Sequence, residues 1–210
     1  MNENALREAI CAHGRLLFGR GYSVGSAGNI SVRLPGGFLM TPTNSCLGRL
    51  EPDRISKLDR DYRHVSGDKP SKEVFMHRAF LEARPEAGAV VHLHSTHATA
   101  IACLAEPGDA APIPPLTPYF VMRIGRSLPV VPYYRPGDAA MEPAIAEAAR
   151  GSRAALLANH GPVVSGKSLD DAVYAAEELE EAARLALMLR GQQARQLTPS
   201  QVDDLLETFG

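Results

Sequence analysis

Two histidines separated by one residue are the first feature that could do chemistry. His92 and His94 end the apolar, β-branched run GAVVHLH at 88–94, which is typical of a buried strand. Because side chains alternate along a strand, both imidazoles would lie on one face, close enough to share a metal ion. The pair alone is equally compatible with ordinary hydrogen bonds at a strand end, so a third ligand is needed.

His160 is the candidate for that third ligand. It follows a second apolar run, RAALLAN at 153–159, and the pair Gly161-Pro162 after it predicts a sharp turn that would fix its direction. Three imidazoles with one open coordination position form the catalytic arrangement of zinc. We therefore predict a divalent-metal site, with Zn²⁺ as the favoured ion, on His92, His94 and His160.

The remaining histidines are expected to stay outside this site. His97 lies three residues after His94, but the chain is expected to turn into a helix there, which favours a structural or ligand-supporting role over ligation. His13 lies in a predicted helix, and His64 and His77 have charged neighbours. For these three we predict positions on the surface or on a helix face.

Such a metal needs a group that moves a proton, and Glu73 is the candidate. It lies in the first turn of a predicted helix that runs to residue 83, with Ser71 in position to cap it. Carboxylates are common in first turns because they suit the helix dipole, so this position alone favours a structural role.

Three small polar loops offer backbone donors to an anionic group: 26–29, 41–44 and 71–72. Each loop alone is more often an ordinary turn. Their occurrence together with a histidine site makes them candidates for binding a substrate phosphate.

The remaining sequence sets the architecture. We expect helices over 4–20, 74–83, 96–104 and 168–190, a hairpin over 25–43, buried strands over 88–94 and 153–159, a short strand within 53–66, and a loop over 107–136 with a short strand at 128–133. Helices alternate with strands and a hairpin, which predicts one domain over 1–210. It is expected to be a three-layer α/β/α sandwich with a mainly antiparallel or mixed central sheet.

Composition excludes several classes of protein. The net charge of -2 leaves no basic stripe for nucleic acid, and no apolar stretch reaches membrane-spanning length. The N-terminal segment is interrupted by charges and does not resemble a signal peptide, so we expect a cytoplasmic protein. Three cysteines at unrelated spacings predict reduced thiols.

Five motifs in order resemble the class II aldolase family, which includes L-fuculose-1-phosphate aldolase and L-ribulose-5-phosphate 4-epimerase. These motifs are Gly28-Asn29, Thr41-Pro42-Thr43, Ser71-x-Glu73, His92-x-His94 and Asn159-His160-Gly161. The resemblance implies an α/β/α fold, a cyclic homotetramer with active sites between subunits, and zinc on the three histidines. It also implies that Glu73 moves the proton.

The resemblance further assigns the substrate contacts. Asn29, Thr43 and Ser71 match positions that hold the substrate phosphate, and Gly28 belongs to the same loop as Asn29. Tyr119 matches a tyrosine that assists proton transfer from a neighbouring subunit.

Two positions depart from the aldolase pattern. Lys72 stands where the aldolase has a second serine, and Asn44 replaces a glycine; both are expected to contact the substrate. Together with the segments 45–48, 67–73, 115–119 and 134–138, they resemble the 3-oxo-tetronate 4-phosphate decarboxylases within this family. An ammonium at Lys72 could hold the phosphate or the departing carboxylate, although pairing with a surface acid is also open.

The implied reaction is zinc-dependent decarboxylation of 3-oxo-tetronate 4-phosphate, a small phosphorylated sugar acid. It would give dihydroxyacetone phosphate and carbon dioxide through a metal-stabilised enediolate. A class II aldolase or epimerase is the alternative, because an aldolase reaches the same enediolate by another bond cleavage. Methylthioribulose-phosphate dehydratases would also keep the ligands. A non-catalytic adducin-like head would lack these histidines, which are all present here.

Overall fold

The predicted hairpin lies near the middle of the central sheet. In the computed structural model, which describes residues 2–209, β1 (Asn29–Leu34) pairs antiparallel with β2 (Gly37–Met40), and Leu34 lies opposite Gly37 across the turn. Two short strands, β3 (Ser56–Leu58) and β4 (His64–Ser66), extend this edge of the sheet. The segment 53–66 therefore forms two strands where one was predicted.

The other half of the sheet carries the histidine segments. It contains β5 (Ala89–His92), β8 (Gly161–Gly166), β7 (Ala154–Leu157) and β6 (Val130–Val131). Across residues 2–209 the strand order is β4-β3-β2-β1-β5-β8-β7-β6. Of the pairs along this order, β6 with β7 is parallel and the others are antiparallel. This confirms the mixed, mainly antiparallel sheet.

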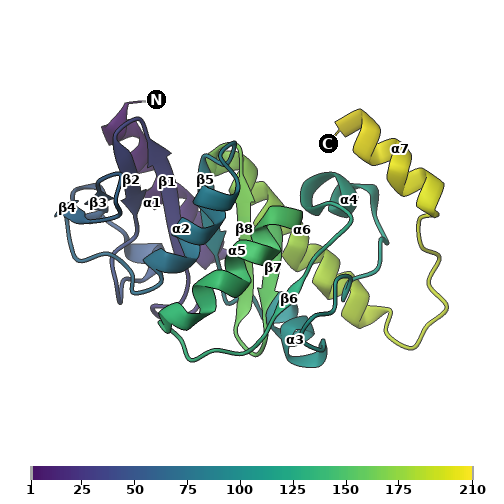
Figure 1. Cartoon of the computed structure of the whole chain (residues 1–210). Helices are drawn as coiled ribbons and strands as arrows, with labels where there is room; N and C mark the ends of the chain where they lie inside the picture. Colours follow the sequence, from purple (N-terminus) through teal and green to yellow (C-terminus); the bar gives the residue numbers. More distant parts are fainter. Residues whose placement is uncertain (1, 210) are drawn as a thin grey trace.

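Helices cover both faces of the sheet (Figure 1). One face is covered by α2 (Val74–Ala83) and α5 (Glu142–Gly151), which pack against each other. The other face is covered by α1 (Glu3–Gly19), α3 (Thr96–Leu104), α4 (Pro118–Ile124) and α6 (Leu169–Met188). The α/β/α prediction is confirmed. The C-terminal α7 (Pro199–Phe209) contacts α4.

Alternation along β5 divides the core into two buried clusters. Ala89, Val91 and Leu93 belong to the cluster beneath α1, α3, α4 and α6, whereas Val90 belongs to the cluster beneath α2 and α5. By the two-residue period of the strand, His92 shares the face of Val90. The apolar strand therefore ends in an imidazole that faces the α2 layer.

Two local expectations need correction. The structure begins α2 at Val74, so Glu73 is the residue just before the first helical turn rather than a member of it. Ser71 does not cap the helix itself: its hydroxyl accepts the backbone N–H of Glu73 at 3.3 Å. The side chain therefore fixes the approach of the chain to the helix.

Several elements had not been predicted from the sequence. These are α4, which lies inside the proline-rich stretch that was expected to be loop, and also α5, α7 and β8. The 3₁₀ turns Leu47–Arg49, Pro52–Arg54 and Ala139–Met141 complete the described elements. Among residues 2–209, no helix combines the length and apolar character needed to cross a membrane. The three cysteines are free, as predicted.

Candidate metal and substrate site

The three predicted ligands come from neighbouring parts of the sheet. His92 is the last residue of β5 and pairs with Val163 of the adjacent β8. His160 lies in the turn between β7 and β8, next to the same end of β5. His94 lies beyond the strand, in the link to α3, so the expectation that both residues of the pair are within the strand is wrong. The two rings nevertheless meet.

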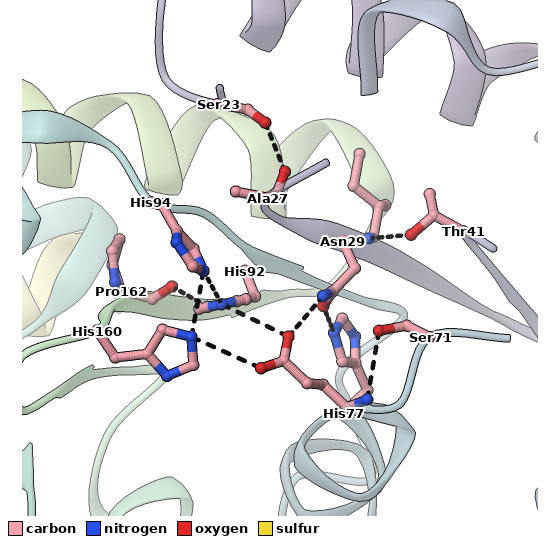
Figure 2. A network of polar contacts seen from close by, with 12 residues as sticks. Ser23, Ala27, Asn29, Thr41, Ser71, His77, His92, His94, His160 and Pro162 are labelled. Carbon is pink, nitrogen blue, oxygen red and sulfur yellow. Dashed lines mark hydrogen bonds and ion pairs between the residues drawn. The ribbon is translucent and has the colours of Figure 1, made fainter. Parts of the chain in front are cut away.

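The ring nitrogens converge on one point (Figure 2). The Nε2 atom of His94 lies 3.1 Å from Nε2 of His92 and 3.1 Å from Nε2 of His160. One nitrogen from each ring lies within 4.8 Å of the other two. Zinc–nitrogen bonds in a tetrahedral site place neighbouring ligand nitrogens roughly 3.3 Å apart. The spacing therefore fits a single small divalent cation.

The chemistry of the rings supports the same conclusion. The Nδ1–H of His92 donates to the carbonyl of Pro162 at 2.8 Å, which leaves its Nε2 with a free lone pair. Burial lowers the pKa of His92 well below its usual value and also lowers the pKa values of His94 and His160. A neutral imidazole keeps one nitrogen lone pair that can bind a cation, and in His92 this lone pair is on the nitrogen that faces the other two rings. These residues could therefore hold a metal.

The turn that orients His160 differs from the predicted one. It closes before Gly161, where the N–H of His160 donates to the carbonyl of Leu157 at 3.0 Å and Asn159 adopts a left-handed φ of 56°. Gly161 and Pro162 are already in β8. A Cβ at Gly161 would lie 2.3 Å from the carbonyl oxygen of Leu93, so glycine is required by the close approach of the residue that follows β5.

Glu73 faces the three imidazoles from the start of α2. Its Oε2 lies 3.7 Å from Nε2 of His92, and its Oε1 lies 3.6 Å from Nε2 of His160. The side-chain amide of Asn29 donates to Oε2 at 2.8 Å. The carboxylate is thus held beside the space that a metal would occupy, at longer than hydrogen-bond distance from both rings.

Backbone hydrogen bonds bring the predicted phosphate loops together. The N–H of Thr43 donates to the carbonyl of Lys69 at 2.9 Å, and the N–H of Ser71 donates to the carbonyl of Thr41 at 3.3 Å. These contacts place the loops 41–44 and 71–72 side by side, next to the loop 26–29.

The three loops and the histidine site share one cavity of about 250 Å³. Its lining contains every residue predicted to bind the substrate, together with Glu73 and two of the imidazoles. The lining residues are Ser26, Ala27, Gly28, Asn29, Pro42, Thr43, Asn44, Ser71, Lys72, Glu73, His94, Pro136, Gly137 and His160. The third imidazole, that of His92, is fully buried behind them.

The two departures from the aldolase pattern lie in this lining. Asn44 has a φ of 55°, a left-handed conformation that glycine favours and asparagine tolerates. It therefore keeps the backbone of a glycine while adding an amide to the cavity. Lys72 is exposed and forms no ion pair within residues 2–209, so the pairing with a surface acid considered above is not observed.

His77 lies on a helix face, one of the two predicted positions, but on the buried face of α2 and not on the surface. Its side chain is buried in the α2 layer, with 1% of its surface exposed. One ring nitrogen, Nδ1, lies 2.7 Å from the hydroxyl of Ser31, and Nε2 lies 2.5 Å from the side-chain oxygen of Asn29. Burial lowers the pKa of His77 to about 3. The helical period could have revealed it, because His77 lies one turn after Glu73.

The other predicted residues lie away from the cavity. Tyr119 is in α4, with 63% of its surface exposed, and does not line the cavity of its own chain. His97 contacts Glu180 instead of the metal ligands, as expected for a structural residue. His13 is partly buried and contacts Asp170, and His64 is exposed.

A mixed sheet between helical layers, with three imidazoles and a carboxylate at one cavity, defines the class II aldolase type of protein. The chain belongs to the class II aldolase and adducin N-terminal domain family, whose model matches residues 8–187. The predicted family resemblance is therefore confirmed.

Individual proteins of this family show which of its members the chain is similar to. The chain is 50% identical over 204 residues to a 3-oxo-tetronate 4-phosphate decarboxylase of Escherichia coli (strain K12), covering 97% of this chain and 96% of that protein. It is similar to the crystal structure of YgbL from Escherichia coli, with a TM-score of 0.93, 49% identity, and coverage of 97% and 98% of the two chains. An L-fuculose phosphate aldolase of Escherichia coli O6:H1 is 35% identical over 167 residues, which are 80% of this chain and 75% of that protein. The expectation of an enzyme of the carboxy-lyase type agrees with the names of the relatives at about half identity.

Proposed function

We propose that this protein decarboxylates 3-oxo-tetronate 4-phosphate to dihydroxyacetone phosphate and carbon dioxide. The observation that carries the proposal is the convergence of three imidazole nitrogens, the Glu73 carboxylate and three polar loops on one cavity of about 250 Å³. The relatives that are about half identical bear the name of this decarboxylase.

The reaction needs an electron acceptor and a proton. When a 3-oxo acid loses carbon dioxide, the electron pair of the broken carbon–carbon bond moves toward the ketone oxygen, and the carbon then takes up one proton. A zinc ion, or another divalent metal, held by His92, His94 and His160 would stabilise the negative charge that develops on that oxygen.

Glu73 is proposed to deliver the proton. Its carboxyl group lies beside the histidine site, and Asn29 donates a hydrogen bond to one of its oxygens, so the group is held in one orientation. A positioned carboxylic acid next to the reacting carbon can act as a general acid and then recover its proton from water.

The loops are proposed to hold the two ends of the substrate. Thr43, Ser71 and the backbone around Gly28 offer neutral donors to a phosphate, and Asn29 keeps a second amide hydrogen for the same purpose. Lys72 adds the one ammonium of the lining, which suits either the phosphate or the carboxylate before it leaves. Asn44 adds a neutral amide beside it.

The assembly and location are proposals as well. We propose a homotetramer in which Tyr119 reaches the active site of a neighbouring subunit, because this exposed side chain lies away from the cavity of its own chain. A single domain over 1–210 and a cytoplasmic location complete the proposal.

A class II aldolase or epimerase is the second candidate, favoured by the relative named L-fuculose phosphate aldolase. One assay separates the two. The zinc-loaded protein is incubated with stereoisomers of 3-oxo-tetronate 4-phosphate and with ketose 1-phosphates, and carbon dioxide and aldehyde release are measured. Carbon dioxide release from the sugar acid supports the decarboxylase, whereas aldehyde release alone would overturn it. A protein that binds metal but turns over neither class of substrate would contradict both.

A further inference from the structure

Beyond these assigned groups, a chain of hydrogen bonds leads from the candidate proton donor into the core, and Figure 2 shows its middle contact, between Asn29 and His77. It runs from Glu73 through the side-chain amide of Asn29 and the ring of His77 to the hydroxyl of Ser31. The geometry points to His77 as a positioning residue that fixes the amide of Asn29 and thereby orients the carboxylate of Glu73. This inference rests on the proposed role of Glu73 in proton transfer.

In each hydrogen bond, the donor and the acceptor follow from the hydrogen bond before it. The oxygen Oε2 of Glu73 accepts from the NH₂ group of Asn29 at 2.8 Å, an arrangement that fits the ionised carboxylate and also a carboxyl group that carries its proton on Oε1. The amide oxygen of Asn29 then faces Nε2 of His77 at 2.5 Å, so Nε2 must carry the proton. In a neutral ring Nδ1 is then an acceptor, and it receives the hydroxyl proton of Ser31 at 2.7 Å.

Secondary structure holds all four groups in place. Asn29 and Ser31 are two residues apart in β1, so their side chains project from the same face of the sheet. Glu73 and His77 are one helical turn apart at the start of α2, on the side that meets this face. Two rigid elements therefore carry alternate members of the chain.

Because these side chains are buried, the arrangement restricts the orientation of the Asn29 amide. The exposed fractions of Asn29, Ser31 and His77 are 5%, 2% and 1%. While His77 keeps its proton on Nε2, an amide that flipped would turn its oxygen toward the carboxylate and its NH₂ toward the Nε2–H, replacing two hydrogen bonds with two repulsive contacts, of which the one with His77 is buried. Without the ring, only the contact with Glu73 would oppose such a flip.

His77 is absent from the lining of the substrate cavity and from the group of metal ligands. Its effect must therefore pass through Asn29. Replacing it should lower the rate of proton transfer while leaving substrate binding and metal binding in place.

The first experiment compares His77→Leu with His77→Gln in the zinc-loaded protein. Leucine fills the buried space but has no donor, whereas glutamine places a donor nitrogen near the position of Nε2. We expect His77→Leu to lower kcat by roughly 10- to 100-fold with KM and zinc content within about twofold, and His77→Gln to recover most of that loss. His64→Leu, at an exposed site, is the control and should leave kcat unchanged.

A double-variant cycle shows whether the effect passes through Glu73. If it does, adding His77→Leu to Glu73→Gln should lower kcat no further. Full additivity, or unchanged kcat in His77→Leu, would overturn the inference. If Glu73→Gln itself leaves kcat unchanged, the proposed function of Glu73 fails instead, which keeps the two failures distinct.

A spectroscopic measurement is independent of activity and of how well the leucine variant folds. Nitrogen-15 NMR of the histidine-labelled, zinc-loaded protein at neutral pH should show His77, assigned by the signal lost in His77→Gln, as a neutral ring protonated at Nε2. In Ser31→Ala, which keeps the ring but removes its hydroxyl partner, the Nδ1 resonance should shift. A ring protonated at Nδ1, or at both nitrogens, would overturn the inference. The inference would also be overturned if His77→Leu and His77→Gln lost zinc and substrate affinity to the same extent. That result would indicate that His77 has a structural role alone.

Discussion

Glu180 contacts His97 twice, through the same carboxylate oxygen. Its Oε1 lies 2.7 Å from Nδ1 of the His97 ring and 2.9 Å from the backbone nitrogen of that residue, and Oε2 accepts the N–H of Ala98 at 2.8 Å. The carboxylate comes from α6 and is 3% exposed. It therefore satisfies two of the free N–H groups at the start of α3, directly after the segment that carries His94.

Replacement of this carboxylate should destabilise the fold. Glu180→Gln replaces one accepting oxygen with an NH₂ group that faces N–H donors, so we expect the free energy of unfolding to fall by about 1–3 kcal/mol. Urea unfolding followed by circular dichroism measures the change. Glu181→Gln is the matched control, because Glu181 is more exposed and contacts Arg184 within the same helix. Identical midpoints for Glu180→Gln and the control would contradict the proposed capping.

Removal of one imidazole should abolish metal binding. In His94→Ala, one of the three converging nitrogens is lost, and we expect the affinity for zinc to fall on the order of 100-fold or more. Metal content after dialysis, measured by inductively coupled plasma mass spectrometry, reports the loss. His64→Ala, an exposed histidine outside the site, should keep its metal. Full metal content in His94→Ala would exclude this ligand set.

Glu73→Gln should separate proton transfer from metal binding. Glutamine keeps the shape of the side chain but cannot deliver a proton, so we expect kcat to fall by about 10²- to 10⁴-fold with zinc content unchanged. Steady-state kinetics and metal analysis of the same preparation test both parts. Glu82→Gln, at an exposed position of α2, the helix that follows Glu73, is the control. Loss of metal in Glu73→Gln would make Glu73 a ligand instead.

Lys72→Ser should weaken the binding of the proposed substrate, which carries both a carboxylate and a phosphate. A hydrogen bond to a charged group contributes about 1.5–3 kcal/mol, so the expected rise in KM is roughly 10- to 100-fold. Lys69→Ser is the control, because Lys69 is exposed in the same loop and does not line the cavity. Unchanged KM and kcat in Lys72→Ser would remove this residue from the substrate site.

The buried neutral ring of His77 should make stability depend on pH. Its pKa falls from an ordinary value of 6.5 to about 3 in the fold, so between these values the unfolded chain binds a proton that the native protein does not. Stability should therefore fall as the pH decreases from 6.5 toward 3, by at most about 1.4 kcal/mol per pH unit for this group. Urea unfolding of the metal-free protein between pH 7 and pH 4.5, roughly the upper part of that window, should show a shallower slope in His77→Gln than in the parent chain. Equal slopes would show that His77 does not contribute.

Much of the fold could be predicted because its signals are local. The hairpin is marked by Pro35-Gly36-Gly37, and α6 is marked by Ser168, whose hydroxyl accepts the N–H of Asp171 as its cap. The helices α1 and α3 and the strands β5 and β7 also lie where apolar periodicity indicated. Each of these patterns is contained in fewer than about 25 residues, so no knowledge of distant contacts is needed.

The strand β8, which was not predicted, depends on contacts with other parts of the chain. Its glycines and Pro162 are typical of turns, but Gly161 and Gly166 are required by neighbours: a Cβ at Gly166 would lie 2.3 Å from the backbone nitrogen of Ala172. The breakers in its sequence therefore reflect close packing against β5 and α6.

The sequence predicted the candidate metal ligands and the substrate loops, but it did not predict the buried side chain that lies behind them. The spacing of His92 and His94 and the ordered motifs identified the residues that the fold brings together. Charged neighbours in the sequence suggested a surface position for His77, yet the face of α2 that meets β1 is set by the whole cluster beneath it. Side-chain burial in a helix is a tertiary property, and the neighbours in the chain do not determine it.

The positions of the three imidazoles have one more consequence. His94 and His160 are 66 residues apart in the sequence, and the intervening chain includes α3, α4, β6, α5 and β7. A metal held by both would link the two ends of this segment in the folded protein, and because the site does not exist in the unfolded chain, the free energy of metal binding would add to the stability of the fold. A variant that cannot bind the metal would then lose this link between the two ends of the segment, and stability with it, as well as the proposed Lewis acid.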